Sequence, residues 1–423
     1  MCRNSPTDSN VTIIEPIARP LPSWGDFGTS LDRHTVTNAV VAWLFAVTGP
    51  LAVLLAVSTK ANFEHDQVAA WIFGAYAIPG LLSVVTSYLY RQPSGIAWSI
   101  PGAILIGPAL DHFSFAEVVA ANIAAGILIT VLGISGAIGK VMSLCPLPIV
   151  MGMVCAVFLP FELKIITGFE DNFWIALAIV TAFIVASALP AVAKVAPPVL
   201  AALAAGIIAV IVAGPGPQLS SMHFALVRPT IFVPGFSIPA LLELVLPLTV
   251  TVIGIHNPQG FSVLESSGYK VPINALTLAC GVGSILSALA GSVPTCVAGP
   301  SNAIMCSSGR ANQRFMAGIV YGLLFVAFGI LAPAVVGLAS TLPASFIGVL
   351  GGLALLRALQ SWMATAFSGD LSLGALTAFL VTLSGVSIFH IGAAFWGLIF
   401  GVGISWLLEQ AKLQKAQIRS SRG

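Results

Sequence analysis

Long apolar segments alternate with short polar stretches along almost the whole chain. A helix that crosses a membrane needs about 20 predominantly apolar residues, and twelve segments approach that length without interruption. This pattern predicts an all-α polytopic membrane protein. The twelve segments are 35–58, 68–90, 115–139, 147–166, 173–189, 195–213, 238–255, 273–291, 314–337, 343–359, 371–388 and 391–408.

Two further apolar segments, 94–110 and 293–307, cannot be uninterrupted helices. Pro294 has no backbone N–H, and residues 295–297 favour extended backbone, whereas Pro300 suits the first position of a new helix. We therefore predict that each segment is a short strand followed by a half-helix, and that the two cross near the membrane midplane. Protein or a wet cavity must then cover their polar backbone. The alternative is a surface loop between two helices.

Composition supports a membrane protein and excludes several other classes. Hydrophobic residues make up 57% of the chain and charged residues 8%, with a mean hydropathy of +1.00, whereas soluble proteins have about a quarter charged residues. A net charge of +2 gives no indication of nucleic-acid binding. The six cysteines lack metal-site spacing, and no nucleotide-binding or nucleophile-elbow motif is present, so we predict no metal, no cofactor and no enzyme activity. The first 34 residues lack the apolar region of a cleavable leader.

Basic residues concentrate on the cytoplasmic side of membrane proteins. Fourteen spans with both termini in the cytoplasm leave only Lys60, Lys164 and Arg228 outside, and an odd number of spans would spoil this asymmetry. We therefore predict a multi-pass protein of the cell (inner) membrane. The basic residues on the inside are Arg3, Arg19, Arg33, Arg91, Lys140, Lys194, Lys270, Arg310, Arg314, Arg357, Lys412, Lys415, Arg419 and Arg422.

Small-residue spacings repeat between the two halves of the chain. Gly126 and Gly133 recur as Gly322 and Gly329, and both separations are 196 residues (322 − 126 and 329 − 133). The two broken segments are separated by a similar distance. Because each half then holds seven spans, the second half enters the membrane in the inverted orientation. A 7+7 inverted repeat with discontinuous helices is typical of secondary transporters.

Two motifs resemble those of one transporter family. Residues 255–269 read Ile-His-Asn-Pro-Gln-Gly-Phe-Ser-Val-Leu-Glu-Ser-Ser-Gly-Tyr, which resembles the Gln-Asn-Ala-Pro-Gly…Val-Leu…Gly-Tyr signature of benzoate:proton symporters (BenE-type). Residues 97–103 read Ala-Trp-Ser-Ile-Pro-Gly-Ala and are similar to that family's Ala-Trp-Ser-Thr-Pro-Gly-Ala stretch. The likeness covers nearly the whole chain after the polar N-terminus. His256 departs from it, because the family tends to have glutamine there.

The resemblance implies a fold distantly similar to uracil permeases and sulfate transporters, in which a core domain moves against a gate domain like an elevator. A homodimer formed through the gate domains is a further expectation. The acidic residues that hold the base in uracil permeases have no match in this sequence. The expected organisation is a polar cytoplasmic tail at 1–34, core at 35–140, gate at 141–213, an extracellular loop at 214–235, core at 236–337, gate at 338–409 and a basic cytoplasmic tail at 410–423.

The two half-helix starts, at Pro101 and Pro300, are expected to direct two positive dipole ends into one cavity. Because no acidic residue lies beside them, this site favours an anion such as a carboxylate, and Trp98 offers an apolar face to an aromatic ring. The alternative is that the polar side chains only cap the half-helices. The predicted substrate-binding residues are Trp98, Ser99, Ile100, Gly102, His256, Asn257, Gln259, Thr295, Gly299, Ser301 and Asn302.

His256 is the predicted proton-coupling residue, because histidine titrates near neutral pH and ionisable groups inside membranes mark functional sites. We expect it at the inner end of the span 238–255, beside an Asn-Pro pair that ends the helix. The alternative is a histidine that only satisfies free carbonyls at that helix end. Among the acids, Glu162 is expected to form an interfacial pair with Lys164, and Glu243 is expected to face lipid headgroups.

These features favour a secondary transporter whose partners are a proton, the lipid bilayer and a small organic anion, for example an aromatic carboxylate such as benzoate. A carrier of the same fold for a nucleobase or an inorganic anion is the alternative. A channel is less favoured, because it needs a continuous polar pore.

Overall fold

The computed structural model describes residues 14–138, 146–189, 198–213, 226–307, 309–339, 341–389 and 391–409. The basic tail 410–423 and parts of the predicted N-terminal tail (1–13) and extracellular loop (214–225) lie outside these ranges. Apart from two short strands, the regular structure of the described residues is helical. The helices are α1 Trp24–Ser30, α2 Arg33–Lys60, α3 His65–Tyr90, α4 Ile100–Ala109, α5 Phe115–Ser135, α7 Leu147–Asp171, α8 Phe173–Ala188, α10 Pro198–Ala213, α11 Ile238–Val250, η2 Thr251–His256, α12 Asn257–Ser266, α13 Ile273–Leu289, α14 Gly299–Cys306, α15 Phe315–Ile330, α16 Ala332–Ala339, α17 Ala344–Phe367, α18 Ser372–Leu383 and α19 Ala393–Leu408.

The two strands, β1 Ile96–Trp98 and β2 Thr295–Val297, pair with each other in antiparallel orientation. In their register Ala97 lies opposite Cys296. Each strand is followed at once by a short helix, α4 after β1 and α14 after β2. The predicted strand and half-helix in each broken segment are therefore confirmed.

Serine side chains satisfy one backbone N–H of each strand. The Oγ of Ser83, on α3, accepts a hydrogen bond of 2.8 Å from the N–H of Ile96, and the Oγ of Ser284, on α13, accepts one of 3.0 Å from Thr295. Both serines are buried. Buried backbone groups need partners of this kind, because a two-stranded sheet leaves one side of each strand unpaired.

Two asparagines serve the same strands. Asn302, on α14, accepts a hydrogen bond of 2.7 Å from the N–H of Gly95. Asn257, at the start of α12, accepts one of 2.9 Å from the N–H of Val297. These contacts join segments 207 and 40 residues apart in the chain, and they fasten both half-helix regions to the crossing point.

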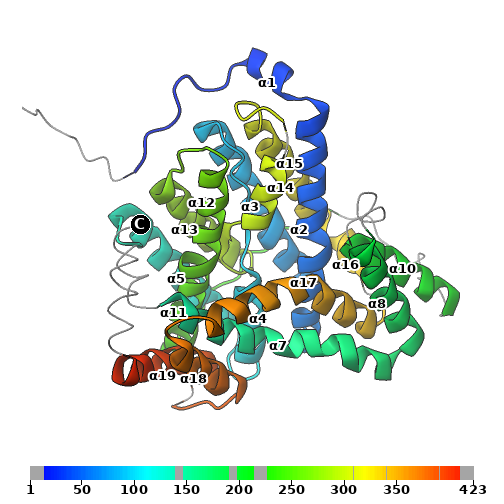
Figure 1. Ribbon diagram of the computed structural model, residues 1–423, viewed down its shortest axis with the longest axis vertical. Helices are drawn as coiled ribbons and strands as arrows, with labels where there is room; N and C mark the ends of the chain where they lie inside the picture. The colour runs from blue at the N-terminus through cyan, green and yellow to red at the C-terminus, as the bar shows by residue number, and fades with distance from the viewer. Residues whose placement is uncertain are drawn as a thin grey trace, which may run out of the picture.

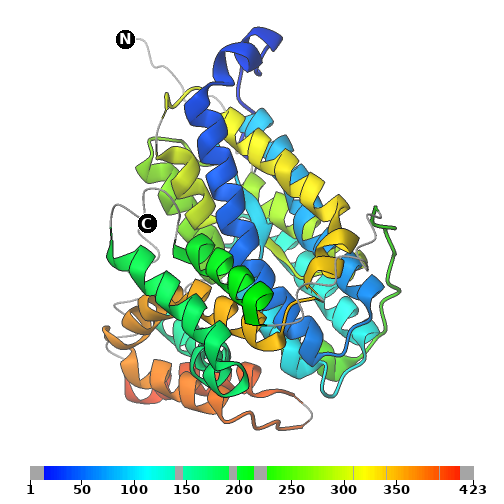
Figure 2. The same cartoon turned by 90° about the vertical axis from the view of Figure 1, so that its right-hand side faces the viewer.

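The helices form two groups (Figures 1 and 2). The strand-centred group, residues 33–135 and 238–339, surrounds β1 and β2, with α15 against α3 and α13 against α5. The peripheral group, residues 147–213 and 344–408, packs mainly through α17 on α7, α18 on α19 and α10 on α8. In Figure 1, α7, α17, α18 and α19 run across the lower part of the molecule. The long helix α2 contacts α17 and so links the two groups.

Close helix crossings in the strand-centred group depend on glycine. A Cβ atom at Gly133 on α5 would lie 2.7 Å from the backbone nitrogen of Leu278 on α13. A Cβ atom at Gly329 on α15 would lie 2.7 Å from the backbone nitrogen of Ala77 on α3. Small residues allow such close backbone approach in membrane bundles, so both crossings require glycine.

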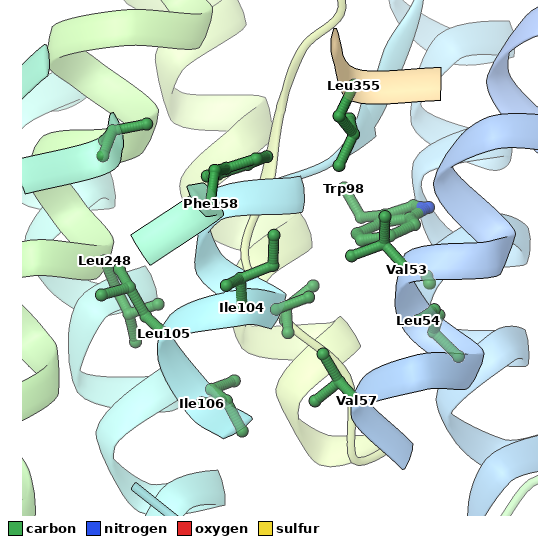
Figure 3. Packing of buried hydrophobic residues seen from close by; sticks show 14 of the residues in the cluster. Val53, Leu54, Val57, Trp98, Ile104, Leu105, Ile106, Phe158, Leu248 and Leu355 are labelled. Atoms are coloured by element: carbon green, nitrogen blue, oxygen red, sulfur yellow. The ribbon is translucent and has the colours of Figure 1, made fainter. Parts of the chain in front are cut away.

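An apolar cluster extends across the boundary between the groups (Figure 3). Val53, Leu54 and Val57 come from α2, and Trp98 comes from the end of β1. Phe158 on α7 and Leu355 on α17 join them from the peripheral group. Trp98, two residues before the start of α4, is thereby held in this apolar cluster.

By length and composition, six of the described helices can cross a membrane, or seven if the bent pair α15 and α16 is one span. That pair is bent by 65°, whereas the sequence predicted one span over 314–337. Six further apolar helices have 10–17 residues. The chain is thus a helical polytopic membrane protein.

The predicted end of a span at Ile255 is wrong. The helix continues from Ile238 to Ser266, through the π-helical turn η2 and into α12. Pro258 has no N–H to donate to an α-helical hydrogen bond. The turn just before it is wider than an α-helical turn, because the N–H of Asn257 bonds to the carbonyl of Val252, five residues back. The helix can therefore continue past the proline. The expected helix end becomes a distortion within a longer helix.

The predicted polar tail is partly folded onto the bundle. The carboxylate of Glu15 accepts hydrogen bonds of 3.0 Å from the N–H groups of Asn274 and Ala275, in the first turn of α13. Arg91 bonds to the carbonyl of Pro20 at 3.2 Å. A free helix start attracts a carboxylate, so this segment docks at one end of the strand-centred group.

A candidate anion site at the start of α14

A cavity of about 500 Å³ lies between the strand-centred group and α8, α10 and α17 of the peripheral group. A cavity of this volume suits a small organic molecule. Its walls are mostly apolar. The lining residues are Phe45, Ala46, Thr48, Gly49, Pro50, Ala97, Trp98, Ile100, Phe183, Pro198, Val199, Leu200, His256, Gln259, Cys296, Ala298, Gly299, Pro300, Ser301, Leu353, Ala354, Leu355, Arg357, Ala358, Ser361 and Trp362.

The start of α14 forms part of this wall, through Gly299, Pro300 and Ser301. In the part of the chain that the structure describes, no side chain caps this helix. The N–H groups of Gly299 and Ser301 have no acceptor within the helix, because a first turn has none. These donors and the positive end of the helix dipole favour an anion at this wall.

The start of α4 differs from that of α14. The Oγ of Ser99 accepts a hydrogen bond of 3.1 Å from the N–H of Gly102, so this helix is capped by its own N-cap residue. Of the residues at this start, Ile100 lines the cavity, whereas Ser99 and Gly102 do not. The anion-binding capacity of the two half-helices is therefore unequal, and α14 has the freer donors.

Aromatic side chains give the cavity flat apolar surfaces. Trp98 is 3% exposed and packs edge-on against Tyr76, with ring centroids 6.1 Å apart. Phe45 on α2 and Trp362 on α17 also line the cavity. Aromatic rings pack well against such faces, so the walls can accept the ring of a ligand.

His256 lines the cavity from the π turn, where its Nδ1 lies 3.2 Å from the carbonyl oxygen of Thr251. Because a carbonyl only accepts hydrogen bonds, Nδ1 carries a proton in this geometry. The ring's other nitrogen, Nε2, is then the one that can gain or lose a proton. Gln259, one turn further along, also lines the cavity and lies against Gly299.

Six of the eleven predicted site residues line the cavity, namely Trp98, Ile100, His256, Gln259, Gly299 and Ser301. The other five surround the strands instead, and their side chains or backbone serve the local structure. Ser99 and Gly102 form the cap of α4, Asn257 and Asn302 accept from strand N–H groups, and Thr295 donates to the carbonyl of Cys280 at 2.7 Å.

Arg357 is a cavity residue that the sequence analysis counted among the cytoplasmic charges, at the inner end of the predicted span 343–359. The helix α17 continues beyond the predicted end at Leu359 to Phe367, so Arg357 lies ten residues before the end of the helix. A basic residue two positions before the end of an apolar segment is typical of a flanking charge. The signal that could have identified it is the mostly apolar run 362–367, which extends the segment beyond the predicted end at Leu359.

Two predictions about acidic residues are wrong. Glu162 is 7% exposed and neither carboxyl oxygen has a hydrogen-bond partner among the described residues, so it does not pair with Lys164. Glu243 is 5% exposed and does not face headgroups. Its Oε2 accepts a hydrogen bond of 2.6 Å from the N–H of Gly392 and lies 3.0 Å from His112 Nε2.

A helical membrane bundle in which the starts of two broken segments line one cavity is the architecture typical of membrane transport proteins. The chain belongs to the benzoate membrane transport protein family (BenE), which it matches over residues 30–407. It is 28% identical over 379 residues to the inner membrane protein YdcO of Escherichia coli K12, covering 88% of this chain and 95% of that one. It is also 28% identical over 379 residues to the benzoate membrane transport protein of Acinetobacter baylyi, covering 88% and 94%.

Solved structures share the fold at low sequence identity. The structure of SLC26A9 has a TM-score of 0.59 at 13% identity, covering 88% of this chain and 65% of that one. The transmembrane domain of the cyanobacterial bicarbonate transporter BicA has a TM-score of 0.54 at 14% identity, covering 94% and 99%. The chain thus spans about two thirds of SLC26A9 and nearly all of the BicA domain.

Proposed function

We propose that this protein is a secondary transporter of the inner membrane that takes up an aromatic carboxylate, such as benzoate, together with a proton. The observation that carries the proposal is the combination of an uncapped helix start and aromatic walls in one cavity of about 500 Å³. The name of the Acinetobacter relative provides independent support.

The charge of the cavity supports an anionic substrate. Among the described residues that line it, none is Asp or Glu. The start of α14 contributes a positive dipole end worth on the order of 0.3–1 kcal/mol, and up to about 2 kcal/mol when partly buried. A carboxylate can accept from the free N–H groups of Gly299 and Ser301 while its ring lies against Trp98.

We also propose fourteen spans arranged as a 7+7 inverted repeat, with both termini in the cytoplasm. Two equivalent sets of contacts support the repeat. Gly133 packs on Leu278 and Gly329 packs on Ala77; the glycines are 196 residues apart and their partners 201 (278 − 77). The strand-bonding serines, Ser83 and Ser284, are also 201 residues apart.

The strand-centred group fits the predicted core domain, 35–140 and 236–337, and the peripheral group fits the predicted gate domain, 141–213 and 338–409. The cavity lies between the two groups. A relative movement of the groups would therefore carry a bound ligand from one side of the membrane to the other. This is the elevator-type mechanism that we propose.

Proton coupling is assigned to His256, which shares the cavity with the start of α14. Moving a monoanion into a cell with a negative interior costs roughly 2.3 kcal/mol per 100 mV, and one proton cancels that charge. A bound carboxylate favours the protonated ring by opposite-charge attraction. By linkage, the protonated ring then favours the carboxylate by the same factor.

Uptake into proteoliposomes tests this function. Radiolabelled benzoate should accumulate when the outside is acidic, and unlabelled benzoate should compete, whereas benzamide, uracil and sulfate should not. His256→Gln should still bind benzoate but lose most of its pH dependence between about pH 5.5 and 7.5. Equal competition by benzamide would refute anion selectivity, and an unchanged pH profile would show that another group, or the neutral acid itself, carries the proton.

A further inference from the structure

Arg357 is the one described Asp, Glu, Lys or Arg residue that lines the cavity. It comes from α17 of the peripheral group, whereas the start of α14 belongs to the strand-centred group. The two positive features therefore lie on different walls of one cavity and on different groups of helices.

Placing the charge of Arg357 within an apolar helix costs free energy unless a ligand, water or an opposite charge compensates it. Charged residues inside membrane spans are rare, and they commonly line a water-filled cavity or a substrate path. Among the described residues, no carboxylate forms an ion pair with Arg357, and its side chain is exposed rather than packed away. The guanidinium is thus free to meet a ligand.

We propose that Arg357 binds the carboxylate of the substrate from the α17 side of the cavity, opposite the start of α14. This inference rests on the proposed function, because it takes the substrate to be a carboxylate. Guanidinium groups match carboxylates with two parallel N–H···O bonds, which a lysine cannot reproduce. The substrate class is accordingly a monoanion with a planar carboxylate and an apolar body.

This placement has a consequence for movement. Arg357 and the positive end of α14 carry like charge, which would oppose approach of the two groups of helices without a ligand. A bound carboxylate neutralises that repulsion and lets the two walls approach. The ligand therefore links binding to the relative position of the two groups, and Arg357 is the contact on the peripheral side.

Equilibrium binding of benzoate to the purified full-length protein tests the assignment. Arg357→Gln should weaken binding about 10- to 100-fold, the range for loss of a charge-assisted hydrogen bond to a buried partner. Arg357→Lys should fall between the wild type and the glutamine variant, because it keeps the charge but loses the paired geometry. The matched control is Arg228→Gln, which removes the same charge from an exposed site outside the cavity and should bind like the wild type.

The outcomes separate this inference from the proposed function. If the wild type binds benzoate and Arg357→Gln binds it equally well, Arg357 has no such role and the proposed function stands. If the wild type binds no aromatic carboxylate, the proposed function itself fails. Thermal unfolding of each variant, measured without ligand, shows whether weaker binding comes from loss of the fold. A folded Arg357→Lys variant that binds more weakly than or equally to the glutamine variant would contradict binding of the carboxylate by the charge of Arg357.

Discussion

At the scale of residues, the buried acids Glu162 and Glu243 differ in their partners. Glu243 accepts a hydrogen bond from Gly392, and His112 lies beside it, whereas both carboxyl oxygens of Glu162 lack partners in the described part of the chain. A buried polar group contributes to stability only when its bonds are made. Glu243 also joins the strand-centred group to the peripheral group, because Gly392 directly precedes α19.

We expect Glu243→Gln to lower the free energy of unfolding by about 1–2 kcal/mol, since an amide replaces charge-assisted bonds. Glu162→Gln is the matched control, and it removes no such bond. Thermal unfolding in detergent measures both variants. An equal loss of stability in the two variants would mean that the contacts of Glu243 contribute nothing.

The residues of the site were only partly predictable from the sequence. Ser301 and Gly299 could be assigned because a Gly-Pro-Ser run marks a helix start by local chemistry. Asn302 could not be assigned correctly, because its partner, Gly95, is 207 residues away. Side-chain partners across such distances depend on the tertiary fold, which local patterns do not contain.

At the scale of elements, prolines gave both a correct and an incorrect prediction. Pro294 and Pro300 mark a true interruption, with β2 between them. Pro258 marked a helix end in the sequence, yet the helix continues through a π turn. A proline removes one N–H in both cases, and only the surrounding packing decides whether the helix ends or widens around the gap.

The short helix α1 provides a pH-dependent element outside the spans. The backbone N–H of Ser23 donates to the Asp26 carboxylate, which holds the pKa of Asp26 below its ordinary value, and Arg91 lies 3.5 Å from the same oxygen. A depressed folded-state pKa gives stability that is present near neutral pH and is lost as pH falls through the folded value.

We therefore expect the amide protons of residues 23–30 to lose protection against hydrogen exchange below about pH 4. Asp26→Asn should show the weaker protection already at pH 7. Corrected for the intrinsic exchange rate, an unchanged pattern down to pH 3 would contradict the role of the Asp26 carboxylate.

At the scale of the whole molecule, the apolar pattern and the charge asymmetry predicted a helical membrane bundle, and the structure confirms that class. The pattern could not show which helices pack together. α3 packs on α15, and α5 on α13, so each pair joins opposite halves of the chain. Such pairings follow from the fold as a whole and have no local signal.

The proposed topology places Thr230 outside and Ser266 inside. Both positions are exposed, so single cysteines there, in a background without native cysteines, should react with a membrane-impermeant reagent. Thr230→Cys should label in intact cells, and Ser266→Cys only after the membrane is permeabilised. Labelling of both positions from the same side would contradict the number of spans between them.

The central claim is that a carboxylate binds at the start of α14, and the affinity of Ser301→Asp for benzoate tests it most directly. Ser301 is 2% exposed, and its Oγ accepts a bond of 3.4 Å from the hydroxyl of Tyr321. A carboxylate placed here would repel the ligand and occupy the free N–H groups, so benzoate binding should be nearly abolished. Ser301→Ala, the matched control, keeps the backbone donors and should weaken binding only modestly. Benzoate binding by a folded Ser301→Asp protein at wild-type affinity would contradict a carboxylate site at this helix start.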